Sequence, residues 1–283
     1  MSSAPTIAIT GATGVVGGHV ARELADRGVP QRLLVRTPGT ARNLPAAPVF
    51  RSSYSDQDAA RSALKGVDTL FMVSAHESAD RIDQHKSFVD AAVSAGVTHI
   101  VYTSFAAAAP DATFTLARDH WATEQYIRAS GLTWTFLRDS FYLDFMEALV
   151  GDDGVIRGPA GQGRASFVAR ADVGRTAAAT ILDPSAHAGR VYDLTGPEAL
   201  TLAEVAATIS RIRGRDVTFH DETIEEAYAS RASYRAPDWQ VDAWVTTYTA
   251  IRSNIMAPVS SSIEDITGRA PIDLETHLRS HPH

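Results

Sequence analysis

The segment GATGVVG, residues 11–17, constrains the fold of this chain more than any other segment. It follows a short apolar run at residues 5–10 and opens a stretch with helical spacing at residues 15–27. Gly11 permits a tight turn, and Gly17 lets a helix pack closely on the preceding strand. The segment therefore predicts a buried strand, a tight turn and a helix in immediate succession.

Strands and helices are expected to alternate through the first half of the chain. Further strands are predicted at residues 31–36, 47–51, 68–74, 98–104 and 133–138, with helices at residues 56–64, 79–95 and 115–130. Because the strands are apolar almost throughout, helices should cover both faces of their sheet. The pattern predicts an α/β fold, a Rossmann doubly wound parallel sheet.

The regular alternation of predicted strands and helices ends in the second half of the chain. Residues 151–163 are rich in glycine and are expected to form a loop, and the remaining segments predict mainly helices with a few short strands. We expect a Rossmann core at residues 1–150 and a small C-terminal α+β lobe at residues 151–283, with some interleaving of their strands and helices. A cleft between the two would be the ligand site.

Composition excludes several classes of function. The chain has 283 residues, a net charge of −7 and no basic run, so direct binding of nucleic acid is not expected. The absence of cysteine excludes disulfides and thiol catalysis. No metal, Walker or nucleophile-elbow motif is present. With no signal peptide and no apolar run of membrane length, the expected location is cytoplasmic, without a membrane partner.

The glycine-rich turn indicates a dinucleotide site. Backbone N–H groups at the start of a helix attract phosphates, and Gly14 would let the backbone approach a pyrophosphate. The cofactor-binding residues expected in this segment are Gly11, Thr13, Gly14, Val15, Val16 and Gly17. Ser74, Ala75 and His76 end the fourth predicted strand and should also lie beside the cofactor.

The end of the second strand favours NADP(H) over NAD(H). NAD-binding sheets place an acidic residue there to bind the ribose 2′-hydroxyl, but this strand ends Val35-Arg36-Thr37. The planar guanidinium of Arg36 suits a 2′-phosphate.

Several longer sequence motifs resemble those of a known family. They are TGATGVVG, LLVRTP, YTSF, WATEQYIRASG, TWTFLRDSFYLDF and, near the C-terminus, SSSIEDITGRAP. Together they resemble the NmrA-like family of atypical short-chain dehydrogenase/reductases, in particular its NAD(P)H:quinone oxidoreductase and triphenylmethane reductase branch. The resemblance implies a Rossmann fold with a small C-terminal lobe and NADPH as the usual ligand.

The resemblance also assigns candidate site residues. It places His120 near the nicotinamide ribose and Ser104 where a hydroxyl could polarise a substrate carbonyl, as catalytic candidates. Asp139, where the family usually has Asn, and Ser140 would contact the nicotinamide amide through their backbone. Phe105, Phe141 and Tyr142 would wall an apolar substrate pocket.

One pair of residues typical of the wider superfamily is missing. The chain has only two lysines, Lys65 and Lys86, and the residues four positions before them are Arg61 and Ile82, so no Tyr-x-x-x-Lys pair exists. This absence argues against ordinary ketone chemistry. It leaves open the reduction of a quinone, whose phenolate product is a weaker base than an alkoxide.

The sequence thus predicts an NADPH-dependent reductase that transfers hydride to a quinone or similar flat conjugated acceptor. The main alternative is a non-catalytic regulator that binds NADP(H) and senses redox state. A third is an enzyme that reduces an enone or imine. The expected partner is a small-molecule substrate, and the expected state is a monomer or homodimer.

Overall fold

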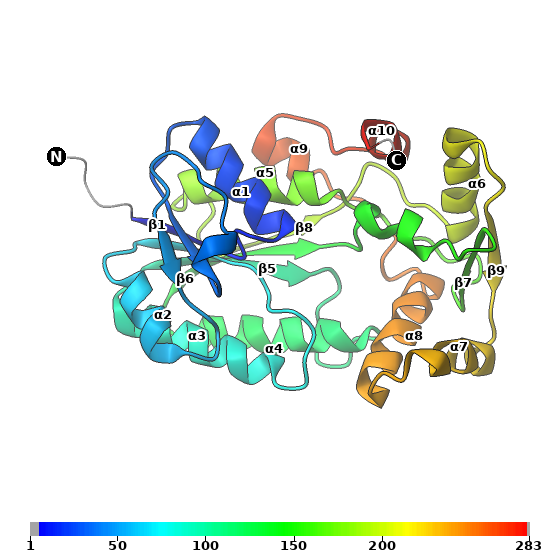
Figure 1. Cartoon of the computed structure of the whole chain (residues 1–283), viewed down its shortest axis with the longest axis horizontal. Helices are drawn as coiled ribbons and strands as arrows, with labels where there is room; N and C mark the ends of the chain where they lie inside the picture. The colour runs from blue at the N-terminus through cyan, green and yellow to red at the C-terminus, as the bar shows by residue number, and fades with distance from the viewer. Residues whose placement is uncertain (1–5, 282–283) are drawn as a thin grey trace. The chain divides into compact units, whose positions relative to one another are not determined.

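The computed structural model describes residues 6–281 (Figure 1). The strands are β1 (Ile7–Thr10), β2 (Arg32–Val35), β3 (Val49–Arg51), β4 (Thr69–Met72), β5 (His99–Phe105), β6 (Thr133–Asp139), β7 (Val155–Gly158), β8 (Arg190–Leu194) and β9 (Thr218–Asp221). The helices are α1 (Val15–Asp26), α2 (Gln57–Leu64), α3 (Arg81–Ala95), α4 (Thr115–Ala129), α5 (Arg170–Leu182), α6 (Leu202–Arg213), α7 (Ile224–Arg231), α8 (Asp238–Arg252), α9 (Ser262–Thr267) and α10 (Leu274–Ser280). Pro5, the first residue of the first predicted strand, lies outside the described residues.

A seven-stranded sheet forms the centre of the fold. Its strand order is β3-β2-β1-β4-β5-β6-β8, and the pairs from β3 through β5 are parallel. The register pairs Ala8 with Arg32 on one side of β1 and with Leu70 on the other. The six strands predicted from the sequence all belong to this sheet, and the strand order reverses direction at β1. The α/β Rossmann fold is therefore confirmed.

The chain divides into two compact units, each with its own core. Among the described residues, the first comprises residues 6–104, 119–138 and 170–192, and the second comprises residues 105–118, 139–169 and 193–281. Within the described residues, no helix combines the length and apolar composition that a membrane crossing requires. The boundary at residue 150 expected from the sequence stays a prediction.

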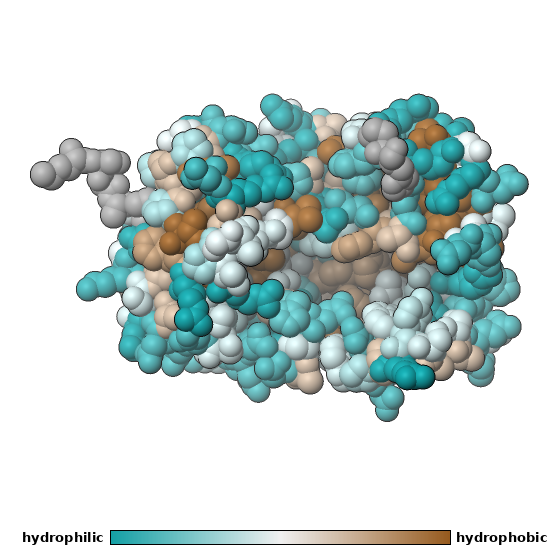
Figure 2. Space-filling view, in the orientation of Figure 1, coloured by the Kyte–Doolittle hydropathy of each residue, from teal (hydrophilic) through white to brown (hydrophobic). Residues whose placement is uncertain are grey.

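The core of the first unit lies between the sheet and its helices. Leu70, Phe88 and Phe136 are fully buried in it, and each such side chain contributes about 1.5–3 kcal/mol when it leaves water. Figure 1 shows α2 and α3, which pack together, on the opposite side of the sheet from the packed pair α1 and α5. The outward surfaces of α2 and α3 are mainly hydrophilic in Figure 2, as an amphipathic helix requires.

In the second unit, the structure corrects one expectation. The glycine-rich stretch at residues 151–163 is not all loop, because it contains β7, which pairs in parallel with β9. The partner strand lies about sixty residues further along the chain, so local sequence gave no sign of this pairing. Thr201 and Glu204 form a capping box at the start of α6.

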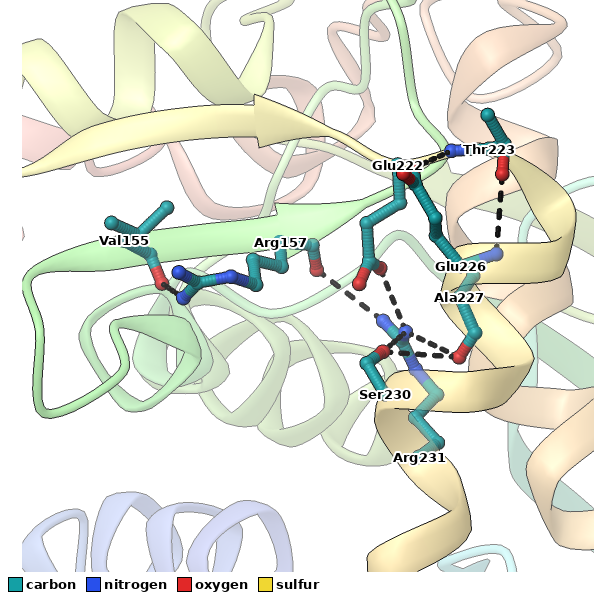
Figure 3. Close-up of polar contacts among 8 residues, drawn as sticks. All are labelled: Val155, Arg157, Glu222, Thr223, Glu226, Ala227, Ser230 and Arg231. Carbon is teal, nitrogen blue, oxygen red and sulfur yellow. Dashed lines mark hydrogen bonds and ion pairs between the residues drawn. The ribbon is translucent and has the colours of Figure 1, made fainter.

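A buried ion pair ties the two-stranded sheet to α7. Arg231 Nη1 donates to Glu222 Oε2 over 2.8 Å, and Arg231 Nη2 donates to the Arg157 carbonyl over 3.3 Å (Figure 3). Both side chains of the pair are at least nine-tenths buried, so removing either one would leave an unpaired charge in the core. Thr223 and Glu226 form a second capping box at the start of α7, which fixes the helix beside the pair.

Candidate functional site

The glycine-rich turn has the geometry that its sequence predicted. Gly11 has a φ of +62°, in the left-handed region that favours glycine. The Gly14 N–H donates to the Gly11 carbonyl over 2.8 Å, and Gly14 is the N-cap residue of α1. A Cβ atom added at Gly17 would lie 2.4 Å from the Gly11 carbonyl oxygen. A side chain at Gly17 would therefore push α1 away from the turn.

This turn opens into a cavity of about 410 Å³ in the first unit. The cavity is lined by Thr10, Gly11, Thr13, Gly14, Leu34, Val35, Arg36, Ser52, Ser53, Tyr54, Ser55, Val73, Ser74, Ala75, His76 and Gln84. These residues come from the carboxyl ends of β1 to β4 and the segments that follow them, which is the ligand-binding edge of a doubly wound sheet. A volume of this size suits a sizeable part of a nucleotide ligand.

The cavity brings together seven of the expected cofactor residues, namely Gly11, Thr13, Gly14, Arg36, Ser74, Ala75 and His76. Three neighbours in the glycine-rich segment are not among its lining residues. Val16 and Gly17 are buried against the sheet, and Val15 is 41% exposed in the first turn of α1. Val16 and Gly17 therefore pack α1 against the sheet, whereas Val15 lies at the surface beside the turn.

Arg36 is the cation of this cavity. It directly follows β2, its side chain is exposed, and within residues 6–281 it has no ion-pair partner. No Asp or Glu of the described chain lines the cavity. The Ser53 and Ser55 hydroxyls line the same cavity and bond to each other over 3.2 Å. Together these groups offer positive charge and hydroxyl donors to an anion.

Tyr54 belongs to this wall and was missed in the sequence. Its hydroxyl donates to the Val73 carbonyl and bonds to Thr10 Oγ1. Its ring packs against Phe88, with ring centroids 4.4 Å apart. The signal that could have found it is the polar stretch Ser-Ser-Tyr-Ser directly after the third predicted strand, because the carboxyl ends of parallel strands share one edge of a sheet.

His120, a catalytic candidate, lies in a buried hydrogen-bond network of the first unit. Arg81 Nη2 donates to its Nε2 over 3.1 Å, and its Nδ1 is 3.1 Å from the Tyr102 hydroxyl. Burial first, and then the Arg81 charge, hold the pKa of His120 well below its usual range. The ring is therefore neutral at physiological pH, and both nitrogens face partners in the protein.

Ser104, the second catalytic candidate, donates its hydroxyl hydrogen to Glu124 Oε1 over 2.6 Å. Glu124 is fully buried and accepts two further hydrogen bonds from Arg138, at 2.8 and 2.7 Å. The two bonds from the planar guanidinium fix the position of the Glu124 side chain in the interior. The Ser104 hydrogen is consequently directed at Glu124, and only its lone pairs are open to another donor.

Asp139 and Ser140 lie in the second unit. Asp139 is 1% exposed, and its Oδ2 accepts from the Tyr142 hydroxyl over 2.8 Å. Its Oδ1 is buried without a partner in the described protein. Burial raises the pKa of Asp139 to about 8, against a smaller lowering by the Tyr142 hydrogen bond. The Ser140 N–H donates to the Leu194 carbonyl over 3.0 Å.

Aromatic rings gather in the second unit. Phe105 lies 5.0 Å from Phe141 and 4.9 Å from Phe114, between ring centroids. Phe105 and Phe114 line an apolar cavity of about 330 Å³, together with a run of small residues that includes Ala106 to Ala109. Phe141 and Tyr142 are not among its lining residues. Phe114, which the sequence did not single out, completes the aromatic group.

The amino-acid sequence matches the model of the NmrA-like family over residues 3–237, which is more than four-fifths of the chain. It is 35% identical over 243 residues to quinone oxidoreductase 2 of Escherichia coli, covering 83% of this chain and 84% of that protein. It is 30% identical over 281 residues to the NAD(P)H azoreductase of Xenophilus azovorans, covering 97% of both chains.

A solved structure shows the same fold. The NADPH-dependent quinone oxidoreductase of Escherichia coli, crystallised with NADPH, superposes with a TM-score of 0.87 at 31% identity. The superposition covers 96% of this chain and 98% of that one. The agreement therefore extends over nearly the whole of each chain.

Proposed function

Because this chain belongs to the NmrA-like family, we propose that it is an NADPH-dependent reductase that transfers hydride to a quinone or a similar flat conjugated acceptor. The observation that carries the proposal is the cavity of the first unit, which is lined by the glycine-rich turn and Arg36 and by no Asp or Glu of residues 6–281. The reductase names of the similar proteins support the same reaction class.

The residues of the cavity fit a dinucleotide with a 2′-phosphate. Backbone N–H groups at the start of α1, next to Gly14, would face the pyrophosphate with the favourable end of the helix dipole. Arg36 would pair with the 2′-phosphate, and the Ser53 and Ser55 hydroxyls could add hydrogen bonds. When bound, the nicotinamide supplies the hydride, and the protein supplies binding and orientation.

The aromatic group of the second unit suits a flat acceptor. Phe105, Phe114 and Phe141 present apolar ring surfaces, and aromatic rings pair favourably in offset or edge-to-face arrangements. We assign substrate contact to Phe105 and, added from the structure, to Phe114, because both line the apolar cavity. Phe141 would support these two rings from outside the cavity, and the contact expected for Tyr142 stays a prediction. Asp139 and Ser140 would serve the nicotinamide amide through their backbone, as the family resemblance implies.

The protein needs no dedicated proton donor for this reaction. The product of hydride transfer to a quinone is a phenolate, whose conjugate acid has a pKa of about 10, so water can protonate it near neutral pH. His120 is neutral and shares both ring nitrogens with neighbours, so we assign it to holding Arg81 rather than to proton delivery. For Ser104, the bond to Glu124 leaves at most an acceptor role.

Substrate selectivity tests this function. With NADPH in excess, we expect measurable reduction of benzoquinones and naphthoquinones and, for simple aliphatic ketones, rates lower by roughly a thousandfold or more, because an alkoxide product needs an acid in the site. The measurement is the initial rate of NADPH oxidation across both panels, with enzyme-free blanks. Equal rates on ketones would overturn the argument from the missing Tyr-x-x-x-Lys pair.

The cytoplasmic location and the monomeric or homodimeric state stay predictions.

A further inference from the structure

The short segment Val73–Ala75 forms one wall of the nucleotide cavity, and side chains hold its backbone. Although the apolar pattern predicted a strand through Ser74, β4 ends at Met72. Beyond that point, the Val73 N–H donates to Thr10 Oγ1 over 2.9 Å, and the Ser74 N–H donates to Thr103 Oγ1 over 2.8 Å. At the cavity, hydrogen bonds to side chains thus replace the backbone hydrogen bonds between neighbouring strands.

His85 on α3 holds the N–H group of Ala75. That N–H donates to His85 Nε2 over 2.8 Å, so the ring hydrogen must lie on Nδ1. Nδ1 faces Thr123 Oγ1 at 2.8 Å, and the Thr123 hydroxyl donates in turn to the Asp119 carbonyl on α4. The neighbouring bonds therefore fix the tautomer of His85. Burial, with a smaller contribution from the Arg81 charge, lowers its pKa to about 3, so Nε2 remains an acceptor at physiological pH.

Arg81, also on α3, holds the carbonyl group of the same residue. Its Nε donates to the Ala75 carbonyl over 3.0 Å, and the side chain is only about one-twentieth exposed. The remaining guanidinium nitrogens face His120 Nε2 at 3.1 Å and Asp119 Oδ2 at 3.7 Å. The planar guanidinium thereby has little freedom to turn away from Ala75.

We propose that His85 and Arg81 are positioning residues for the dinucleotide, because they clamp the N–H and the carbonyl of Ala75 and so fix the wall formed by residues 73–76. Neither residue lines the cavity itself. They act through the backbone of Ala75, which does. The inference rests on the proposed function only for its ligand, NADPH. The role that it assigns to His85 and Arg81 differs from that of the glycine-rich turn and Arg36, which would contact the ligand directly.

The test is the affinity of purified His85→Leu for NADPH and for NADH, measured by calorimetry. Leucine cannot accept the Ala75 N–H, so we expect both dissociation constants to rise about tenfold, the effect of one lost buried hydrogen bond. The ratio between the two cofactors should stay unchanged, because the clamp holds a wall that both would share. His85→Gln, whose side-chain oxygen can reach a similar position, should recover most of the affinity.

His99→Leu is the matched control. His99 is a buried histidine on β5 that bonds Thr135 over 2.9 Å and is not among the lining residues of the cavity. We expect its dissociation constants to change by less than about twofold, although its melting temperature should fall as that of His85→Leu does. Unchanged affinity in folded His85→Leu, an equal loss in His99→Leu, or no recovery in His85→Gln would overturn the proposal.

If His85→Leu does not fold, Thr123→Val replaces it. This variant removes the partner of His85 Nδ1 and should raise both dissociation constants about threefold, whereas no rise would overturn the proposal. Turnover supplies a second measurement where it occurs. KM for NADPH should rise while kcat changes by less than about twofold, because the clamp acts on binding. Since the calorimetry needs no turnover, absence of quinone reduction would count against the proposed function and leave this test valid.

Discussion

Replacing Arg36 with Ala should raise the dissociation constant of NADPH roughly a hundredfold and that of NADH less than about threefold. The two cofactors differ only in the 2′-phosphate, which carries close to two negative charges. Arg36 lines the cavity with its guanidinium exposed and without an ion-pair partner in the described chain, so its donors are free for that group. Calorimetric titration of both cofactors measures the change directly.

Two further variants sharpen this prediction. Arg36→Lys keeps the charge but loses the two-pronged donor geometry, so its NADPH affinity should fall between those of the wild type and Arg36→Ala. Arg51, which pairs in register with Val35 from the neighbouring strand but does not line the cavity, provides the control. Arg51→Ala should leave both affinities nearly unchanged. An equal loss of NADPH and NADH affinity in Arg36→Ala would remove the 2′-phosphate assignment.

Replacing Asp139 with Asn should stabilise the protein by several kcal/mol at about pH 9 and change its stability little at about pH 4. Asp139 is almost completely buried, and Tyr142 is the titratable group that contacts its carboxyl in the described chain. Its pKa is raised to about 8, mainly by burial. An amide has nearly the same shape and never needs to ionise, so it avoids the cost of a buried charge.

The direction follows from the two pKa values of Asp139. In the unfolded chain the carboxyl has its ordinary pKa of 3.8, whereas in the folded protein the pKa is about 8. The folded state therefore holds the proton more tightly. Its contribution to stability is fully present below about pH 4, falls as the pH rises, and is lost above about pH 8.

Urea unfolding of both proteins across this pH range measures the effect. The wild type should lose stability by up to about 1.4 kcal/mol per pH unit relative to Asp139→Asn, with the difference levelling off above about pH 8. Asp152→Asn, at an exposed carboxylate, should follow the wild type throughout. Parallel curves for the wild type and Asp139→Asn would mean that Asp139 is ionised in the folded protein at neutral pH.

The parts of the fold that local sequence dictates could be predicted. The alternation of apolar strands with helical segments predicted the parallel sheet, and the glycine spacing predicted the tight turn at Gly11. Arg36 could be placed because a residue that ends the second strand of such a sheet must lie at the ligand edge. Each of these inferences needs only the spacing of residues along the chain or the position of a residue in a known sheet topology.

Other features depend on contacts between distant segments. Helical spacing could not show that His85 and Arg81 both reach Ala75, nor that β4 would stop before Val73 because side chains take over its hydrogen bonds. The environment of His120 was equally hidden. Its lowered pKa depends on burial and on Arg81, which lies 39 residues earlier in the chain. A family resemblance indicates a position, but the partners of the side chain decide its chemistry.

NADPH-dependent reduction of a quinone is measured most directly as kcat/KM for a naphthoquinone, with NADPH and with NADH in parallel. We expect turnover well above the enzyme-free rate, with NADPH preferred by about tenfold or more and the preference lost in Arg36→Ala. Tight binding of NADPH without oxidation by any quinone would contradict the reductase. It would instead favour a protein that binds the dinucleotide and senses its redox state.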